Sequence, residues 1–259
     1  MPERTNCYDY PQYWDLAFRS ETKLEADFIE AACTKYCNFP AKRLLEPGCG
    51  GGRLVVEMSA RGYEVTGFDL SEPSIKYLTK RLARRKLGAR AIAADMTTFV
   101  SRRQFDAAFC TFNTFRHLTT EDMARQHLEC VAQSLRPGGI YILGFHLLPP
   151  DADEDCIERW SARHGKTKVT MTLRVLDFDR NKRLETIRFS LRVRTGSRDL
   201  KLQSDYQYRI YTAAQFQRLL ISVPQFELCD VYDFWYDIEE PFQLSNELGD
   251  AVFVLRKRS

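Results

Sequence analysis

The stretch that decides the fold is Leu44-Leu45-Glu46-Pro47-Gly48-Cys49-Gly50-Gly51-Gly52-Arg53. Its apolar start predicts a buried strand that ends at Pro47, and the residues from Arg53 onward predict a helix. The glycines between them let the backbone turn sharply and approach a ligand closely, which a Cβ atom would prevent. Asp69 ends the next predicted strand, where its carboxylate can accept hydrogen bonds from both hydroxyls of a ribose. We therefore predict a site for a ribose-bearing ligand.

Strands and helices alternate on both sides of this stretch. Strands are predicted at residues 43–46, 64–69, 90–94, 105–111, 140–146, 226–232 and 251–255. Helices are predicted at residues 21–36, 53–61, 71–87, 120–135 and 212–221. Alternation of this kind implies βαβ units, and hence a parallel sheet with helices on both faces. The predicted fold class is α/β, with a doubly wound, Rossmann-like, mostly parallel sheet of seven strands.

Residues 149–211 follow a different pattern. Strict alternation of apolar and polar residues at 168–176, 186–194 and 200–210 predicts a three-stranded antiparallel insertion before the last helix. We therefore expect three parts. Residues 1–41 form an N-terminal lid segment and a helix, residues 42–148 and 212–259 form the ligand-binding core, and residues 149–211 form an insertion over the ligand site.

Composition narrows the class of protein. The 38 basic and 35 acidic residues nearly balance, which argues against a nucleic-acid partner. The longest mostly apolar run, residues 140–148, is far shorter than the ~20 residues of a membrane span. The N-terminus is polar and carries no export signal, so we expect a cytoplasmic protein. Its eight cysteines form no C-x-x-C pair and its four histidines have no ligand spacing, so no metal site is expected.

Two acidic positions bear on the identity of the ligand. Glu46 precedes the first glycine, where a nicotinamide cofactor would place its anionic pyrophosphate, and it could instead face the ammonium group of an amino acid. Asp95 and Met96 end the third strand, where they are placed to meet the edge of an adenine. A nicotinamide-dependent oxidoreductase is therefore the less favoured alternative. A non-catalytic binding domain is the other, because a fold does not fix a function.

The successive motifs LLEPGCGGGR, VTGFDLS, AADM, FDAAFCTFNTFRHL and LRPGGIYIL resemble those of class I S-adenosylmethionine-dependent methyltransferases. The resemblance covers about Leu44 to Leu147 and implies an enzyme with S-adenosylmethionine as its cofactor. It also implies that the glycine loop and Glu46 hold the methionine part, Asp69 the ribose, and Asp95 and Met96 the adenine. The cofactor-binding positions implied in this core are Glu46, Gly48, Cys49, Gly50, Asp69, Leu70, Asp95, Met96, Thr111 and Phe112.

The outer segments resemble the small-molecule branch of that family, which includes glycine N-methyltransferase and sugar-amine N-methyltransferases. The N-terminal aromatic residues Tyr8, Tyr13 and Trp14 are part of this resemblance. In that branch such residues close over the cofactor, a role that the resemblance gives to Tyr13 and Trp14. The implied reaction is methyl transfer to a small-molecule acceptor, an amine or a hydroxyl compound. Enzymes that methylate bases carry an Asn/Asp-Pro-Pro-Tyr-like stretch where this chain has Cys110-Thr111-Phe112-Asn113, which again argues against a nucleic-acid substrate.

Two histidines are candidate catalytic residues. His117 follows the fourth strand and His146 ends the fifth, both near the crevice where ligands bind in wound sheets. A structural role is the alternative for each of them. One face of the insertion is basic and could select an anionic substrate, or could simply be the solvated face of a half-buried sheet. Its residues are Lys168, Arg174, Arg188, Arg192, Arg194, Lys201 and Arg209.

Overall fold

The computed structural model describes residues 3–4, 6–149, 152 and 156–259 and contains two sheets. The larger sheet has seven strands in the order β11-β12-β6-β5-β2-β3-β4. Its strands are β2 (Arg43–Pro47), β3 (Glu64–Asp69), β4 (Arg90–Ala93), β5 (Phe105–Cys110), β6 (Leu135–His146), β11 (Phe226–Tyr232) and β12 (Asp250–Lys257). Strands β2 to β6 run parallel, whereas β12 runs antiparallel to β6 and β11 antiparallel to β12. The predicted seven-stranded, mostly parallel sheet is confirmed.

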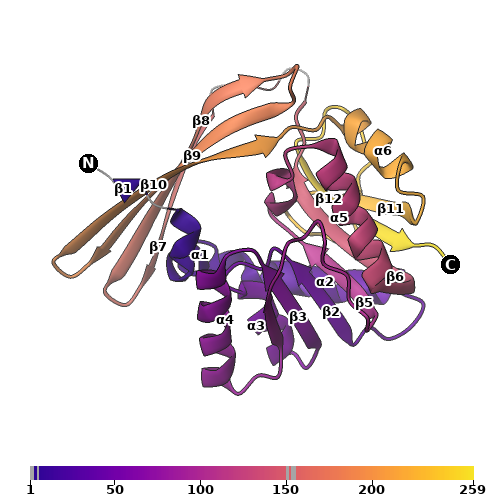
Figure 1. Ribbon diagram of the computed structural model, residues 1–259, viewed down its shortest axis with the longest axis horizontal. Helices are drawn as coiled ribbons and strands as arrows, with labels where there is room; N and C mark the ends of the chain where they lie inside the picture. The colour runs from indigo at the N-terminus through magenta and orange to yellow at the C-terminus, as the bar shows by residue number, and fades with distance from the viewer. Residues whose placement is uncertain (1–2, 5, 150–151, 153–155) are drawn as a thin grey trace.

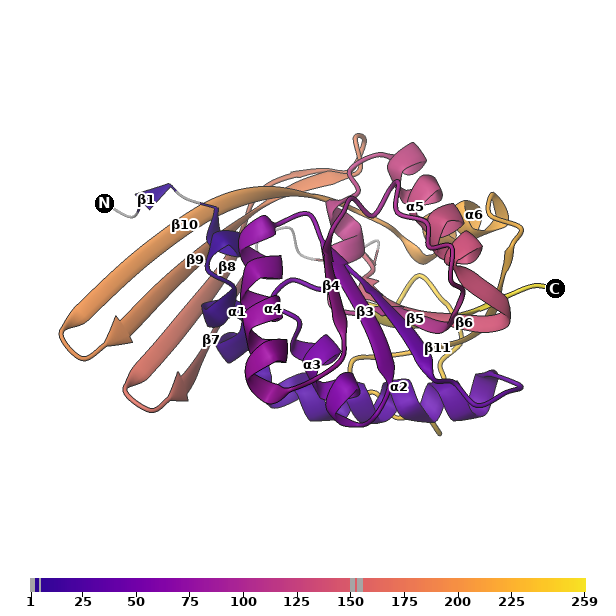
Figure 2. The ribbon, with the colours of Figure 1, turned by 60° about the horizontal axis from the view of Figure 1, so that its bottom comes forward.

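Helices cover both faces of this sheet. The helices are α1 (Pro11–Ala17), α2 (Thr22–Tyr36), α3 (Arg53–Ala60), α4 (Glu72–Arg85), α5 (Glu121–Ser134) and α6 (Ala213–Ile221). Helices α5 and α6 bury Leu128 and Phe216 against one face, whereas α2, α3 and α4 bury Phe28, Val55 and Leu78 against the other. Figure 1 shows α5 and α6 together on their side of the sheet, and Figure 2 shows α2, α3 and α4 on the opposite side. The sheet is therefore the middle layer of three.

The second sheet leaves the core as two long hairpins (Figure 1). It consists of β7 (Ile157–His164), β8 (Thr167–Asp179), β9 (Leu184–Thr195) and β10 (Arg198–Arg209), which run antiparallel, with the short β1 (Glu3–Arg4) parallel to β10. The expectation of a three-stranded insertion is wrong, because β7 makes a fourth strand. Strand β7 lies at the edge of the sheet and is mostly exposed on both faces, so its sequence lacks the apolar alternation that identifies the other three.

The apolar face of the insertion packs on the N-terminal segment. Helix α1 places Leu16, Ala17 and Phe18 in one cluster with Phe189 and Leu191 of β9. The η1 turn (Cys7–Asp9) precedes α1, and the Cys7 amide donates a hydrogen bond to Ser204 Oγ of β10 at 2.8 Å. The N-terminal segment therefore lies between the insertion and the core, as Figure 2 also shows.

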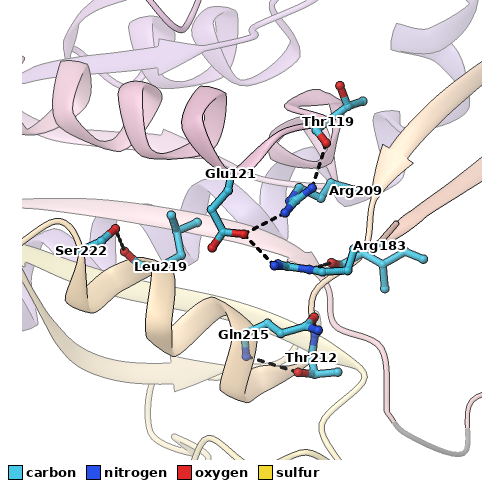
Figure 3. Close-up of polar contacts among 9 residues, drawn as sticks. Thr119, Glu121, Arg183, Arg209, Thr212, Gln215, Leu219 and Ser222 are labelled. Atoms are coloured by element: carbon cyan, nitrogen blue, oxygen red, sulfur yellow. Dashed lines mark hydrogen bonds and ion pairs between the residues drawn. The ribbon is translucent and has the colours of Figure 1, made fainter. Parts of the chain in front are cut away.

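An ion-pair cluster holds the base of the insertion on helix α5 (Figure 3). Glu121 Oε2 accepts hydrogen bonds from Arg183 Nη1 at 2.6 Å and from Arg209 Nη2 at 2.8 Å. Arg209 Nη1 also donates to the Thr119 carbonyl at 2.9 Å. Both guanidinium groups are mostly buried, so without the carboxylate two like charges would face each other away from water.

Glu121→Ala is expected to lower the free energy of unfolding by about 1–3 kcal/mol, because it leaves two buried guanidinium groups without their charged acceptor. Asp122→Ala is the matched control: Asp122 lies in the same first turn of α5, is 79% exposed and pairs with Arg125. That control should change the stability by less than about 0.5 kcal/mol. Urea unfolding of both variants tests this, and equal losses would show that the cluster adds nothing beyond its place at the helix N-terminus.

Candidate functional site

A cavity of about 1040 Å³ lies at the carboxyl ends of the parallel strands. This volume is at the upper end of the range for small-molecule sites, ~300–1,000 Å³. Wound sheets bind ligands at this edge, where the strand order reverses. One side of the cavity is formed by the loops that follow β2, β3, β4 and β5, and the other side by the insertion and the N-terminal segment.

The glycine loop after β2 forms the floor of the cavity. Gly48 and Gly50 have φ angles of +63° and +51°, in the left-handed region that favours glycine. A Cβ atom on Gly48 would lie 2.3 Å from Thr114 Cγ2, whereas one on Gly50 would have no atom within 4 Å. Gly50 and the buried Cys49 both line the cavity, so the backbone of the glycine loop is accessible from the cavity.

Glu46 on β2 places a buried, only partly hydrogen-bonded carboxyl group beside the cavity. The residue is 8% exposed and lines the cavity, and among the described residues its Oε2 has no hydrogen-bond partner. Burial raises the pKa of this carboxyl group to about 8, against the opposing charge of Arg53. Arg53 is itself paired with Glu25, at 2.6 Å. The site therefore holds an acidic group that a cationic ligand would stabilise.

Asp69 at the end of β3 is fixed by the main chain. Its Oδ2 accepts a hydrogen bond from the Gly50 amide and its Oδ1 from the Ser71 amide, each at 2.8 Å. Burial raises the pKa of Asp69, although these amides act in the opposite direction. The neighbouring Leu70 is 75% exposed and lines the cavity, which leaves a large apolar side chain free to cover a flat ligand.

Two further loops bring predicted residues to the cavity. Asp95 Oδ1 accepts hydrogen bonds from the Thr97 amide and hydroxyl at 2.7 Å, and the Met96 carbonyl lies 3.0 Å from His127 Nδ1. After β5, Thr111 Oγ1 donates to Glu25 Oε2 at 2.6 Å. Asp95, Met96, Thr111 and Phe112 all line the cavity. His127, which was assigned no role from its sequence context, is fully buried and supports this edge from within the core.

The N-terminal aromatic residues divide between two sides of α1. Trp14 lines the cavity, stacks on Tyr8 with ring centroids 4.8 Å apart, and donates from Nε1 to the Cys7 carbonyl at 2.9 Å. Tyr13 does not line the cavity and stacks on Tyr10 instead. Neighbouring residues of a helix point about 100° apart, and here Trp14 faces the cavity whereas Tyr13 does not. The expectation that Tyr13 closes over the cofactor is therefore not supported by its position.

The two candidate histidines both reach the cavity but differ in their surroundings. His117 Nε2 is 2.8 Å from the Tyr8 hydroxyl, and burial, reinforced by the charge of Arg116, lowers the pKa of His117 to about 4. Its ring is thus neutral at physiological pH. His146 Nδ1 lies 2.7 Å from Asp250 Oδ1, and the His146 side chain is 36% exposed.

The insertion supplies an apolar wall that sequence reasoning did not assign to the site. Its members are Trp160, Leu173, Val175, Phe178, Ile187, Phe189 and Tyr208. The alternation in β8, β9 and β10 identified the apolar face, but nothing in the sequence indicated that part of this face meets the cavity. The buried pair of Arg116 and Glu185 joins this wall to the loop after β5.

The basic face of the insertion does not line the cavity. None of its seven basic residues is among the described residues around the cavity. Several are neutralised by neighbouring strands: Arg188 forms two 2.7 Å contacts with Asp205, and Arg192 approaches Asp199 to 2.6 Å. Alternate residues of a strand point to opposite faces, so once the apolar face meets the cavity the basic face must point away. The hypothesis that this face covers the site mouth is wrong.

Two other functional classes find no support in the described part of the chain. No group of three or more His, Cys, Asp or Glu side chains is arranged there to hold a metal ion. Within those same residues, each helix is too short or too polar to cross a bilayer.

Residues 44–139 match the model of a methyltransferase domain family. The ubiquinone biosynthesis O-methyltransferase of Azoarcus sp. (strain BH72) is 30% identical over 137 residues, which cover 49% of this chain and 54% of that protein. The chain spans just over half the length of three curated relatives that it matches.

Solved structures share the fold along nearly the whole chain. A S-adenosylmethionine-dependent methyltransferase of Clostridium acetobutylicum ATCC 824 has a TM-score of 0.77 at 18% identity, covering 98% of this chain and 100% of that one. CalS10 of Micromonospora echinaspora, an amino pentose methyltransferase solved with S-adenosylmethionine, has a TM-score of 0.71 at 21% identity, covering 99% of both chains. The sugar N-methyltransferase KedS8 of Streptoalloteichus sp. ATCC 53650 has a TM-score of 0.71 at 16% identity, covering 91% and 87%. These likenesses establish the fold.

Proposed function

We propose that residues 44–139, which match a methyltransferase domain family, bind S-adenosylmethionine and that the protein transfers a methyl group from it to a small-molecule acceptor. The single observation that carries this proposal is the buried carboxyl group of Glu46. This residue lines the cavity beside the glycine loop, and its Oε2 has no hydrogen-bond partner among the described residues. A buried carboxylate suits the ammonium group of a methionine moiety, whereas it would repel the pyrophosphate of a nicotinamide cofactor.

We propose that the other predicted residues hold the rest of the cofactor. Asp69 would accept hydrogen bonds from the ribose hydroxyls, and Asp95 and Met96 would flank the adenine. Trp14 would cover the cofactor on the side of the N-terminal segment, with Tyr8 stacked behind it. S-adenosylmethionine supplies an activated methyl group, so the protein has mainly to align the acceptor and exclude water.

The acceptor is proposed to be a small molecule with an apolar body. This rests on the wall of Trp160, Ile187 and Phe189, which faces the cavity from the insertion. The printed names of related proteins include both sugar N-methyltransferases and O-methyltransferases of ubiquinone biosynthesis. An anionic acceptor is not favoured, because the basic face of the insertion points elsewhere. We also propose a cytoplasmic location, which suits the eight free cysteines.

Titration calorimetry with S-adenosylmethionine, S-adenosylhomocysteine and NAD tests the proposed function. We expect the two adenosyl ligands to bind and NAD to give no heat of binding. Binding of NAD alone would replace the proposal with the oxidoreductase alternative. Binding of none of the three would leave a methyltransferase-like fold without the activity.

Gly50→Ala is expected to weaken binding of S-adenosylmethionine, because its Cβ would enter open cavity space. Gly196→Ala is the matched control. Gly196 has a φ angle of +59°, a Cβ there would also meet no atom within 4 Å, and the residue lies in the distant β9–β10 turn. Each substitution should cost about 1–2 kcal/mol of stability through left-handed strain. Only Gly50→Ala should raise the calorimetric Kd, and equal Kd values in both variants would place the cofactor elsewhere.

A further inference from the structure

His146 and Asp250 face each other across two antiparallel strands at the edge of the cavity. They are direct partners in the register of β6 and β12, and their side chains join through Nδ1 and Oδ1 at 2.7 Å. Both residues line the cavity. An ionised carboxylate only accepts hydrogen bonds, so in the neutral imidazole the proton must lie on Nδ1. The lone pair is then on Nε2.

The imidazole ring is held in place from several sides. It makes T-shaped ring contacts with Phe234, at a centroid distance of 5.0 Å, and with Phe112, at 6.3 Å. The His146 amide donates a hydrogen bond to Asn113 Oδ1 at 2.9 Å, which ties the strand end to the loop after β5. Within the described residues, Nε2 forms no hydrogen bond of its own, so it is the ring nitrogen available to a ligand.

His117, the other histidine of the cavity, is less suited to accept a proton. Its Nε2 is already engaged by the Tyr8 hydroxyl, and burial holds the pKa of His117 down at about 4. The carboxylate partner is what distinguishes His146, because it engages Nδ1 and leaves Nε2 as the nitrogen that can accept a proton.

We propose that His146 is the general base of this enzyme and that its acceptor is a hydroxyl compound. Asp250 is a positioning residue that fixes the tautomer. As the acceptor oxygen bonds to the transferred methyl carbon, the carbon–sulfur bond breaks with its electron pair kept by sulfur, and the hydroxyl proton passes to His146 Nε2. A neutral amine already carries a free lone pair, so it can attack the methyl group without first losing a proton. An amine acceptor of this kind would therefore not need the His146–Asp250 pair as a base. The inference rests on the proposed function and names the acceptor class within it.

The tautomer of His146 can be measured without any ligand. In ¹⁵N NMR spectra of the full-length protein, assigned with a His146→Ala variant, the neutral ring should carry its proton on Nδ1. Asp250→Asn should lose this preference, since an amide can either donate or accept. The His117 signals serve as the internal control and should not change. A native His146 ring with its proton on Nε2 would overturn the proposal.

The acceptor class is tested with a matched pair of apolar probes, 4-butylphenol and 4-butylaniline, together with S-adenosylmethionine. We expect the phenol to be methylated in preference to the aniline. His146→Gln should lower kcat for the phenol ~10²–10⁴-fold, the usual contribution of a general base. Asp250→Asn should cause a smaller loss, and the calorimetric Kd for S-adenosylmethionine should be unchanged in both variants.

The outcomes separate this inference from the proposed function. If the native protein does not bind S-adenosylmethionine, the proposed function fails and the NMR result alone judges the His146–Asp250 pair. If the cofactor binds, the inference is overturned by methylation of the aniline but not the phenol, by transfer to neither probe, or by phenol turnover that is indifferent to His146→Gln.

Discussion

Glu46→Gln is expected to weaken S-adenosylmethionine binding by at least ~100-fold when measured above the pKa of the carboxyl group. Removing one partner of a buried ion pair typically costs ~3–5 kcal/mol, and each 1.4 kcal/mol corresponds to about tenfold in Kd. The Glu46 carboxylate is 8% exposed and its Oε2 has no partner among the described residues, so glutamine would leave the ligand's ammonium group in a nearly dry site without its counter-charge.

Glu46→Gln is also expected to change the pH dependence of the free energy of unfolding in the ligand-free protein. Burial raises the pKa of Glu46 from its ordinary value of 4.5 to about 8, so the folded state favours the neutral acid. Between these two values the unfolded chain is ionised while the folded chain holds the proton. The contribution of this group to the free energy of unfolding is thus complete below pH 4.5 and is lost as the pH rises toward 8. The native protein should lose up to ~1.4 kcal/mol per pH unit in this window relative to Glu46→Gln.

Calorimetry and urea unfolding at several pH values measure the two effects of Glu46→Gln. Glu57→Gln is the control, since Glu57 lies on α3, pairs with Arg61 and does not line the cavity. It should leave the Kd unchanged. An unaltered Kd in Glu46→Gln would remove the observation on which the proposed function depends. Parallel stability curves for the native protein and the variant would show that the carboxyl group is not buried as described.

Asp69→Asn is expected to raise the Kd for S-adenosylmethionine roughly 5- to 150-fold. The carboxylate is held toward the cavity by the amides of Gly50 and Ser71, and its remaining lone pairs would accept from the ribose. An asparagine has one oxygen in place of two, so it cannot keep both amide bonds and also accept from both hydroxyls. Leaving a buried polar group unpaired costs ~1–3 kcal/mol, which corresponds to the stated range in Kd.

Asp106→Asn is the control for Asp69→Asn, because it tests whether the loss of cofactor affinity comes from ribose binding or from a loss of support for the fold. Asp106 Oδ2 likewise accepts from two successive backbone amides, those of Lys42 and Arg43, at 2.8 Å each. It is buried but does not line the cavity. Both variants should therefore lose stability in urea unfolding, while only Asp69→Asn loses calorimetric affinity per folded molecule. A similar rise of Kd in both would mean that Asp69 acts through the fold.

The elements of the core could be read from the sequence because their signals are local. The apolar run at residues 44–46 became β2, and the Thr212-Ala213-Ala214-Gln215 capping box is present at the start of α6. Strand β7 could not be read in this way. Its residues are mostly exposed on both faces, so its place is set by pairing with β8 rather than by burial of an apolar stripe.

The residues of the candidate site fall into the same two groups, those placed by local sequence and those placed by tertiary contacts. Glu46, Gly50 and Asp69 lie in or beside one strand–loop–helix unit, and their relation to a ligand follows from that local geometry. Tyr8, Phe189 and Tyr208 come from segments far apart in the chain and meet only because the insertion folds back over the N-terminal segment. No spacing in the sequence encodes such a meeting. Of the three N-terminal aromatic residues, Tyr8 and Trp14 line the cavity and Tyr13 does not, for the same reason.

The sequence by itself determined a wound sheet with a glycine loop and two carboxylates at its edge, since strand order and turn chemistry depend on neighbouring residues. Only the tertiary structure decided which face of the insertion meets the cavity and that Asp250 lies opposite His146. The physical reason is that these contacts arise from the packing of whole sheets and from strand register. Both are fixed by the burial of apolar surface summed over many distant residues.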